Sequence, residues 1–580
     1  MRASQILGHL VALSCLAGPV AAQRSDFEPV SSAGLERPSP DDWLSFSRTP
    51  DAQRFSPLAE IDRDNVGRLA LAWSRGLGQG ALESIPIVHD GVMYMLTPGA
   101  IVQAVDATNG DLLWEFQPEL ENPSSAPLFR SKTLAIFDDL ILISGPDSYV
   151  IGIDARDGSL RWRTKAGERG HTSGPIVADG KLITGGACGG RGRENCYIAA
   201  HDARTGELLW RFFTTQAPDE PPGFDTWGGA PLETRVASAW GLSGSYDPAR
   251  RLVYWGIANP MPNSRLARHD GDANAIKTST PAELYSNSTV ALDVDTGELV
   301  WYFQHLPGDD WDLDYTNERL LVRTPFDPDP EAVKWINPRI PRGELIDMVV
   351  AVGEPGGVWA LDAGTGEFLW ATPFPHDDEK FHIKDINVET GEVFPNFELG
   401  FQAPGERHVV CYHNTTSFWP SAYHPRLNAA YVPWVDTCLD MTAGAVGEAD
   451  IRDSVVNSAT LDEFAGLAKI DLETGRVEHI YTGRAPGNSG VLATAGDLIF
   501  WGDLNRRFRA FDAENGDILW ETILGGAVQM STITYAVNGK QYVAVYTGEG
   551  LLTGRLIGLA GLSPARSHNA VYVFALPDSG

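Results

Sequence analysis

The sequence predicts an all-β protein, an eight-bladed β-propeller built from tryptophan-docking repeats. A unit of the form Ala-x-Asp-x-x-Thr/Asn-Gly-x-Leu-x-Trp recurs along the 580 residues. Its most closely spaced copies end at Trp114, Trp162 and Trp210, at intervals of 48 residues, which is the size of one propeller blade. The 60 glycines and 38 prolines favour many turns over long helices.

Each copy has a simple physical basis. An apolar strand ends in Ala-x-Asp, and the Asp and Thr side chains can bond the amides of a tight turn. The Gly supplies a positive φ, and a second strand carries the Trp, which we expect to pack between neighbouring blades. Upstream hairpins bring each unit to about four strands. Copies lie at 104–114, 153–162, 200–210, 291–301, 360–370, 470–475 and 510–520, with a degenerate one at 69–73.

The spacing of the copies also predicts insertions and the closure of the ring. The intervals from Trp210 to Trp301 and from Trp370 to His479 are too long for one blade, and His479 stands where the sixth copy would have its Trp. A ring needs its ends joined. The last apolar strand, at 569–576, has no turn after it, so we expect it to complete a blade begun near 69–73.

The N-terminus has the features of a secretory signal at 1–22, with cleavage near Ala22 and Gln23. An alternative, in which Cys15 is a lipoprotein cysteine, has a poor flanking match. Residues 23–60 are rich in Pro, Ser and Asp, and we expect them to wrap the outside of a propeller formed by 61–580. We therefore expect an exported, periplasmic protein.

Charge and hydropathy exclude two classes of function. The net charge of −31 argues against binding of nucleic acid, and it would suit a basic protein partner. No later segment contains about 18 uninterrupted apolar residues, so no membrane span is expected.

Four cysteines remain after the leader: Cys188, Cys196, Cys411 and Cys438. An even number in an exported chain favours two disulfides. Four cysteines allow three pairings, and the sequence alone leaves them open. A Cys188–Cys196 bond would close a short loop and a Cys411–Cys438 bond a longer one. The chain has no Cys-x-x-Cys-His motif, so no covalently bound haem is expected.

Carboxylates gather directly after the repeat that ends at Trp301, in the segment 309–314. Several carboxylates close together are typical of a site for a hard cation. Asp312 and Asp314 are two residues apart, so on an extended segment both would face the same way. The alternatives are a solvated acidic turn and a structural calcium loop.

Three further positions are candidates for a binding site. Asn259 follows an apolar strand and offers a neutral oxygen ligand, although Asn-Pro is more often only a turn. Trp240 lies outside the repeat and could be a stacking platform for a flat ligand. Glu83 precedes an inner strand, where a charged residue would point toward the channel.

Together with the repeat, four stretches resemble the pyrroloquinoline-quinone (PQQ) dependent alcohol dehydrogenases. They are Trp240-Gly with Tyr246-Asp-Pro, Ala258-Asn-Pro, the run at 306–314, and 525–548. The resemblance covers about 40–576 and looks closest to the soluble sorbose/sorbosone and polyvinyl alcohol dehydrogenase branch, which shares the Cys188 and Cys196 pattern.

The resemblance implies a role for each matching residue. Asp312 corresponds to the catalytic base and to a cation ligand, with Asn259 and Asp314 as further ligands. Asp314 is the extra carboxylate of lanthanide-using members. The residues that correspond to PQQ contacts are Glu83, Lys132, Thr172 and Trp240.

Three positions depart from the family pattern. Lys132 stands where an Arg is usual and lacks its bidentate fork. Cys188 replaces a metal-binding Glu, and a disulfide would prevent it from acting as a ligand. Glu354 occupies about the position of a cationic residue that contacts the quinone oxygens.

The resemblance implies a PQQ-dependent dehydrogenase with calcium, or a lanthanide, that oxidises a sugar, a polyol or a bulky secondary alcohol. Electrons would pass to a soluble cytochrome c or another acceptor. Leucines and isoleucine of 551–562 would line an apolar entrance. The rival hypothesis is a non-catalytic scaffold of the cell envelope, which predicts no cofactor. The sequence leaves open the substrate, the cation, the acceptor and the oligomeric state.

Overall fold

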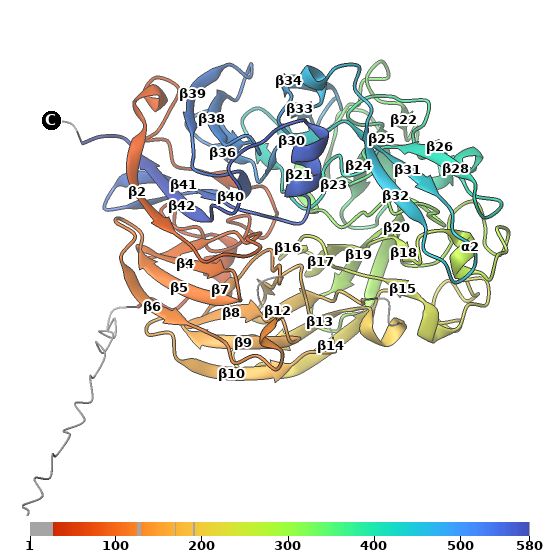
Figure 1. The fold of residues 1–580 in the computed structure, drawn as a ribbon, viewed down its shortest axis with the longest axis horizontal. Coiled ribbons are helices and arrows are strands. Elements are labelled where there is room, and N and C mark those ends of the chain that lie inside the picture. Colours follow the sequence, from red (N-terminus) through yellow and green to blue (C-terminus); the bar gives the residue numbers. More distant parts are fainter. Residues whose placement is uncertain (1–26, 125–128, 169, 190–191, 579–580) are drawn as a thin grey trace, which may run out of the picture.

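The computed structural model describes residues 27–578, except 125–128, 169 and 190–191. Within these residues, eight sheets contain four or five strands each, and they are arranged around a common axis (Figure 1). The prediction of an all-β propeller is confirmed. We assign one blade to each of the eight sheets; this blade number is our interpretation.

Each of the first four sheets is an antiparallel meander of four strands. Their strands are β3 (Ile87–His89), β4 (Val92–Thr97), β5 (Ile101–Asp106) and β6 (Leu112–Phe116); β7 (Ala135–Phe137), β8 (Leu140–Ser144), β9 (Tyr149–Asp154) and β10 (Leu160–Lys165); β11 (Ile176–Ala178), β12 (Lys181–Gly185), β13 (Tyr197–Asp202) and β14 (Leu208–Phe213); and β16 (Ser245–Asp247), β17 (Leu252–Gly256), β19 (Ser288–Asp293) and β20 (Leu299–Gln304).

Three of the other four sheets have five strands. Their strands are β21 (Leu320–Phe326), β23 (Glu344–Val352), β24 (Val358–Asp362), β25 (Phe368–Thr372) and β22 (Trp335–Ile336); β29 (Ala422–His424), β30 (Ala429–Val435), β33 (Ala465–Asp471) and β34 (Val477–Gly483); β36 (Leu492–Thr494), β37 (Leu498–Gly502), β38 (Arg507–Asp512), β39 (Ile518–Ile523) and β1 (Phe55–Ser56); and β40 (Val528–Val537), β41 (Lys540–Thr547), β42 (Ala570–Ala575), β2 (Ala70–Gly76) and β35 (Asn488–Ser489).

The ring closes as expected. Strand β2 pairs antiparallel with β42, with Trp73 opposite Val573, and the two strands lie side by side in Figure 1. Because the first and last parts of the propeller share one sheet, the ring has no free edge at the junction.

The repeated Trp docks on the Gly of the next repeat. The Trp73 indole covers Gly110, where an added Cβ would lie 2.6 Å from the ring. Its Nε1 donates a hydrogen bond to the carbonyl of Ala107, at 3.0 Å. The Gly therefore meets two requirements at once, a positive φ of 77° and room for the neighbouring indole. The same stacking joins Trp114 to Gly158, Trp162 to Gly206, Trp210 to Gly297, and Trp301 to Gly366.

Both long intervals contain insertions, as predicted. The first, between β17 and β19, carries β18 (Pro260–Met261), which pairs with β15 (Val236–Ala237), and the short helix α2 (Arg265–Arg268). The second carries β26 (Ile383–Asn387) and β27 (Glu392–Pro395), and a three-stranded sheet of β28 (Arg407–Cys411), β31 (Thr437–Thr442) and β32 (Ile451–Val456). A third helix, α3 (Thr553–Leu559), lies between β41 and β42.

The expected outer wrap at 23–60 is wrong for the part that the structure describes. This segment begins with helix α1 (Ser32–Glu36) and then runs along the inner strands. Its carbonyls accept bonds from the amides of Tyr246, Leu321 and Tyr423 on three different sheets. Arg54 is fully buried and donates to the carbonyls of Val491 (2.7 Å) and Thr532 (2.6 Å). The segment is part of the core because its backbone and Arg54 satisfy carbonyls and amides of many strands.

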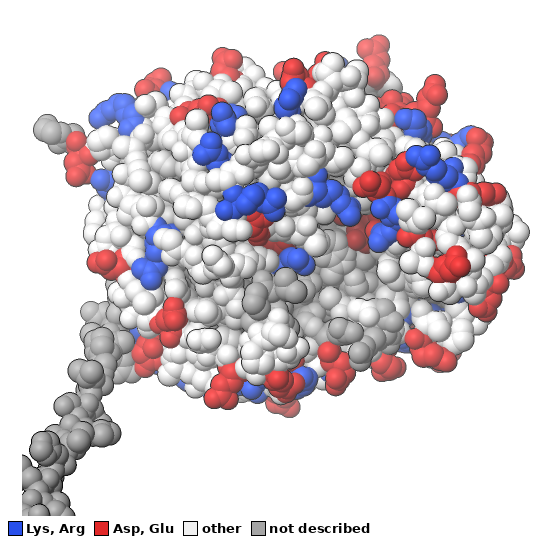
Figure 2. All heavy atoms as spheres, in the orientation of Figure 1, with Lys and Arg blue, Asp and Glu red and all other residues white. Residues whose placement is uncertain are grey.

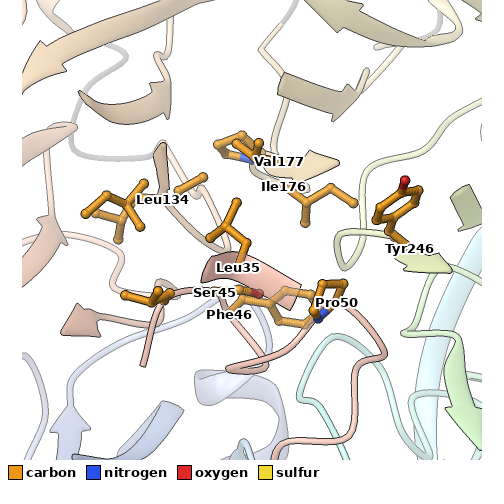
Figure 3. Close-up of a pocket in the computed structure, with 13 residues that line it drawn as sticks. Leu35, Ser45, Phe46, Pro50, Leu134, Ile176, Val177 and Tyr246 are labelled. Carbon is orange, nitrogen blue, oxygen red and sulfur yellow. The ribbon is translucent and has the colours of Figure 1, made fainter. Parts of the chain in front are cut away.

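Figure 3 shows how this segment packs. Leu35 of α1 and Phe46 face Ile176 and Leu134 of the second and third sheets. The cavity between them is about 20 Å³, which is room for about one water molecule. It is therefore a packing defect and not a ligand site.

No helix among the described residues is long and apolar enough to cross a membrane. The predicted leader at 1–22 lies outside the described residues.

The Trp–Gly docking predicts a specific stability effect. Gly110→Ala should cost about 1–2 kcal/mol for the positive φ and a further 1–3 kcal/mol for the clash with Trp73. Gly539→Ala is a matched control, since Gly539 has a φ of 78° with nothing within 4 Å, and it should carry only the first cost. Urea unfolding of both variants measures the difference; equal losses would contradict the docking role.

Candidate active site

The acidic loop after β20 divides into two pairs of carboxylates with different tasks. Asp309 and Asp310 are fully buried. Asp309 accepts the amides of Trp311 (2.7 Å) and Leu313 (2.9 Å), and Asp310 accepts the amide of Arg265 at 2.6 Å. These two residues therefore shape the loop.

Asp312 and Asp314 line one cavity, as their spacing predicts. The cavity measures about 380 Å³. The acidic loop, the three-stranded insertion, the start of α3 and the segments around Trp240, Glu354 and 413–417 meet there. Its lining is mostly polar and comprises Trp240, Asp312, Asp314, Glu354, His413, Asn414, Ser417, Leu439, Asp450, Arg452, Asp453, Leu551, Leu552 and Arg555. Figure 2 shows a hollow in the centre of one face, with Lys and Arg side chains gathered near it.

Asp314 is a buried carboxylate held only by neutral donors among the described residues. Its Oδ2 accepts Trp240 Nε1 at 2.8 Å, and its Oδ1 accepts the amide of Asn259 at 2.8 Å. Loss of hydration raises the pKa of Asp314 to about 6. A carboxylate in this setting can accept a proton or bind a cation.

Glu354 is a second buried carboxylate in the cavity. Its Oε2 accepts the hydroxyl of Ser417 at 2.8 Å, and His413 Nε2 lies 3.7 Å from its Oε1. Burial and, next, the charge of Asp314 raise the pKa of Glu354 well above its ordinary value. Two buried carboxylates thus face one cavity, which is a suitable environment for a cation.

A buried ion pair lies beside the Trp240 ring. Lys132 Nζ contacts Glu83 Oε2, and both side chains are almost fully buried. Lys132 Nζ also lies 4.1 Å from the ring centre of Phe418 and 5.8 Å from that of Trp240. Burial lowers the pKa of Lys132, and the Glu83 carboxylate opposes that shift. Thr172 donates its hydroxyl to the carbonyl of Trp240 at 3.0 Å.

Asp312 is paired with a residue that the sequence did not suggest. Arg452 of β32 forms an ion pair with Asp312 Oδ2. With the Asn263 amide turned to suit its neighbours, its nitrogen donates to Asp312 Oδ1 (3.1 Å) and its oxygen accepts Arg452 Nη1 (2.9 Å). Asp312 also has a φ of 132°, an unusual value for a residue other than Gly.

The structure thus brings together the seven residues that the sequence analysis assigned to the site. Four of them lie in equivalent places, on the segment that enters the first strand of a sheet: Glu83 before β3, Lys132 before β7, Thr172 before β11, and Trp240 before β16. Ser417 has the same place before β29, so the repeat register could have identified it. Arg452 lies within an insertion, where no register applies. The roles of these residues stay predictions.

Both disulfides are present, Cys188–Cys196 and Cys411–Cys438. Cys188 is therefore unavailable as a cation ligand. In the described part of the chain, no three His, Cys, Asp or Glu side chains are gathered as a metal site. The Asn259 side-chain nitrogen donates to the carbonyl of Pro260 at 3.2 Å. The donor chemistry fits a hard cation, since Asp314 and Glu354 are buried without a close cationic partner among these residues.

The predicted apolar entrance is only partly present. Leu551 and Leu552 line the cavity, whereas Leu556 and Ile557 of α3 are buried in the core. Helix α3 turns these side chains inward because burial of an apolar face stabilises it.

Comparison with known proteins identifies the family. The family model for the glucose/ethanol/alcohol dehydrogenase β-propeller domain with PQQ matches residues 43–335 and 438–543. The chain belongs to the PQQ-dependent alcohol dehydrogenases. This assignment favours the enzyme over the scaffold hypothesis. It does not support the narrower sorbose/sorbosone and polyvinyl alcohol dehydrogenase branch.

Relatives and a solved structure agree with this family. The chain is 29% identical to the dehydrogenase subunit of alcohol dehydrogenase (quinone) from Komagataeibacter europaeus, over 93% of this chain and 76% of the relative. It is 27% identical to 1-butanol dehydrogenase (cytochrome c) from Thauera butanivorans, over 92% and 78%. A europium-containing methanol dehydrogenase has a similar structure, with a TM-score of 0.79, 25% identity, and coverage of 94% of this chain and 99% of that chain.

The raised pKa of Asp314 predicts a pH effect on stability in a chelator-treated protein. The folded state keeps a proton that the unfolded state loses between about pH 4 and 6, so this carboxyl makes the free energy of unfolding fall as pH rises through that window. Asp314→Asn removes the effect. The free energy of unfolding of the variant, minus that of wild type, should rise by about 2 kcal/mol from pH 4.5 to pH 7.5. This rise is expected whatever the difference between the two proteins at pH 4.5.

Urea unfolding at the two pH values measures that gain. Asp453→Asn, at an exposed residue lining the same cavity, is the control and should keep the wild-type dependence. Parallel curves for wild type and Asp314→Asn would contradict the assignment.

Proposed function

We propose that this cavity holds PQQ and a cation and oxidises an alcohol to the aldehyde or ketone. The observation that carries the proposal is the convergence of separate chain segments on one cavity. Trp240 and the two buried carboxylates Asp314 and Glu354 line it, and the buried Lys132–Glu83 pair lies beside the Trp240 ring. A buried carboxylate without a counter-ion is costly, so an arrangement of this kind is maintained for binding or chemistry.

The residues divide into three groups. Trp240 offers its ring as one wall, and Lys132 and Thr172 offer donors for the carboxylates of the cofactor. Asn259, Asp312 and Asp314 offer oxygens to calcium or a lanthanide. When bound, PQQ supplies the hydride-accepting quinone, and the cation supplies a Lewis acid that polarises it.

Asp312 is the proposed proton acceptor. Its carboxylate is only 25% exposed, and Arg452 and Asn263 fix its direction. A held carboxylate at hydrogen-bond distance from a bound hydroxyl can remove its proton as the hydride leaves the same carbon. Glu354 lines the same cavity, and in its protonated form it can donate a hydrogen bond inward.

The lining favours a polar alcohol such as a sugar or a polyol. Ser417, Asn414, His413 and Arg555 offer donors, and Asp450 offers acceptors, against few apolar side chains. A hydroxyl-rich substrate could satisfy these groups, whereas an apolar alcohol would leave them unpaired.

We further propose export to the periplasm and transfer of electrons to a separate cytochrome c. The relative from Thauera butanivorans carries cytochrome c in its name. The acidic surface of this chain, with a net charge of −31, would attract a basic acceptor.

The proposal is tested by reconstitution of the purified protein with PQQ and either calcium or lanthanum, an artificial electron acceptor, and a panel of sugar, polyol and apolar alcohols. Turnover that requires both PQQ and a cation is expected, with polyols preferred. Lack of PQQ binding and of turnover with every alcohol would refute it.

Asp312→Asn tests the assignment of the base. We expect kcat to fall by about 10²–10⁴-fold, while PQQ still binds, as followed by its visible absorption. Asp453→Asn changes an acid of the same cavity that has no assigned role and should keep most of the activity. Full activity in Asp312→Asn would show that another residue accepts the proton.

A further inference from the structure

The three-stranded sheet β28-β31-β32 is an insertion that reaches the cavity. It joins two parts of the second long interval, since β28 precedes β29 and β31–β32 lie between β30 and β33. Cys411 and Cys438 are directly opposite each other on β28 and β31, and their disulfide fixes the register of the pair. The insertion therefore holds its side chains in defined positions.

One side chain of this sheet meets the acidic loop. Arg452 on β32 forms an ion pair with Asp312, and the side chain of Asn263 bridges the two. Asp450, two residues before Arg452, accepts the hydroxyl of Ser264 at 3.0 Å and the amide of Gly444 at 3.0 Å. The bond with Ser264 attaches the start of β32 to the other insertion, and the bond with Gly444 stays within the turn before β32. Arg452 is thus held at Asp312 from both sides.

This arrangement places a guanidinium on a carboxylate that the proposed function gives to a cation. A guanidinium always carries a positive charge in proteins. It competes for the same oxygens, and it repels any ion bound beside it by an energy proportional to the charge of that ion. Asp314, the other carboxylate of the loop, has only the neutral donors Trp240 and Asn259 among the described residues. The competition between Arg452 and a bound cation therefore takes place at Asp312.

We propose that Arg452 sets the cation preference of this site. It weakens binding of all cations and weakens a trivalent ion more than a divalent one, so it favours calcium over a lanthanide. This inference rests on the proposed function, because it needs a cation bound at Asp312. It goes beyond that function because it explains why the site would prefer one ion to another.

The test measures cation binding directly. CaCl₂ and LaCl₃ are titrated by calorimetry into the full chain loaded with PQQ, for wild type and three variants. Arg452→Gln removes the charge and Arg452→Lys keeps it. Arg407→Gln is the matched control: Arg407 pairs with Asp440 on the same insertion, and neither residue is among those lining the cavity. The Arg452 side chain is 36% exposed, so these replacements should fold, which circular dichroism verifies.

We expect Arg452→Gln to bind calcium about tenfold more tightly. Because the repulsion scales with ionic charge in the ratio 3:2, lanthanum binding should tighten about thirtyfold. Arg452→Lys should remain near wild type, and Arg407→Gln should be unchanged for both ions.

Three results would overturn the inference while leaving the proposed function intact. They are equal affinities in wild type and Arg452→Gln, the same gain in Arg452→Lys as in Arg452→Gln, and the same gain in Arg407→Gln. A wild-type protein that binds neither PQQ nor either ion would instead refute the proposed function, and this inference with it.

Discussion

The docking of an indole on the Gly of the next repeat is the contact on which the rest of the molecule depends. A four-stranded sheet cannot bury both of its faces alone, so each blade needs a neighbour on either side. Trp114 meets this need by covering Gly158 and donating to the carbonyl of Ala155 at 3.1 Å. The contact recurs at five consecutive junctions between repeats, where it positions each blade against its neighbour. Pairing of β2 with β42 then closes the ring.

A ring held together in this way can carry long insertions without losing its geometry. The candidate site uses this freedom. Glu83, Lys132, Thr172 and Trp240 come from regular places in successive repeats, whereas Arg452 comes from an irregular insertion. The first group is positioned by the ring itself. The second is positioned by a disulfide and by bonds between the insertions. The side chains at equivalent places in the repeats are thus positioned by the propeller, and Arg452 is positioned by the insertions.

Electrostatics gives the cavity its character. The protein holds Asp314 and Glu354 in a dry environment where charge is expensive, and it pairs Asp312 with Arg452 at the mouth. The free protein therefore stores two carboxylates with raised pKa and one that is neutralised by an ion pair. A bound cation would take the place of the proton on Asp314 or Glu354, or of Arg452 beside Asp312. The free-energy cost of that replacement differs between the carboxylates.

The sequence by itself determined the blade unit, its period and the carboxylate run, because turn chemistry and strand alternation are local. The Asp–Thr–Gly turn, for example, forms as expected, with Asp202 accepting the amide of Thr205 at 2.9 Å. The family resemblance selected seven site residues. Four of them come together because the ring brings the ends of equivalent strands together, and the other three lie in the segments after β17 and β20.

Only the tertiary structure decided which surfaces these elements cover and which partners they take. The Pro-, Ser- and Asp-rich composition of 23–60 predicts a wrap on the outside of the propeller, yet Arg54 is buried because carbonyls from distant strands surround it. The leucines after Leu551 suggest an entrance, yet Leu556 packs into the core. The pairing of Arg452 with Asp312 joins residues 140 positions apart through an insertion with no repeat register. Such contacts depend on long-range packing, and no local pattern in the chain encodes them.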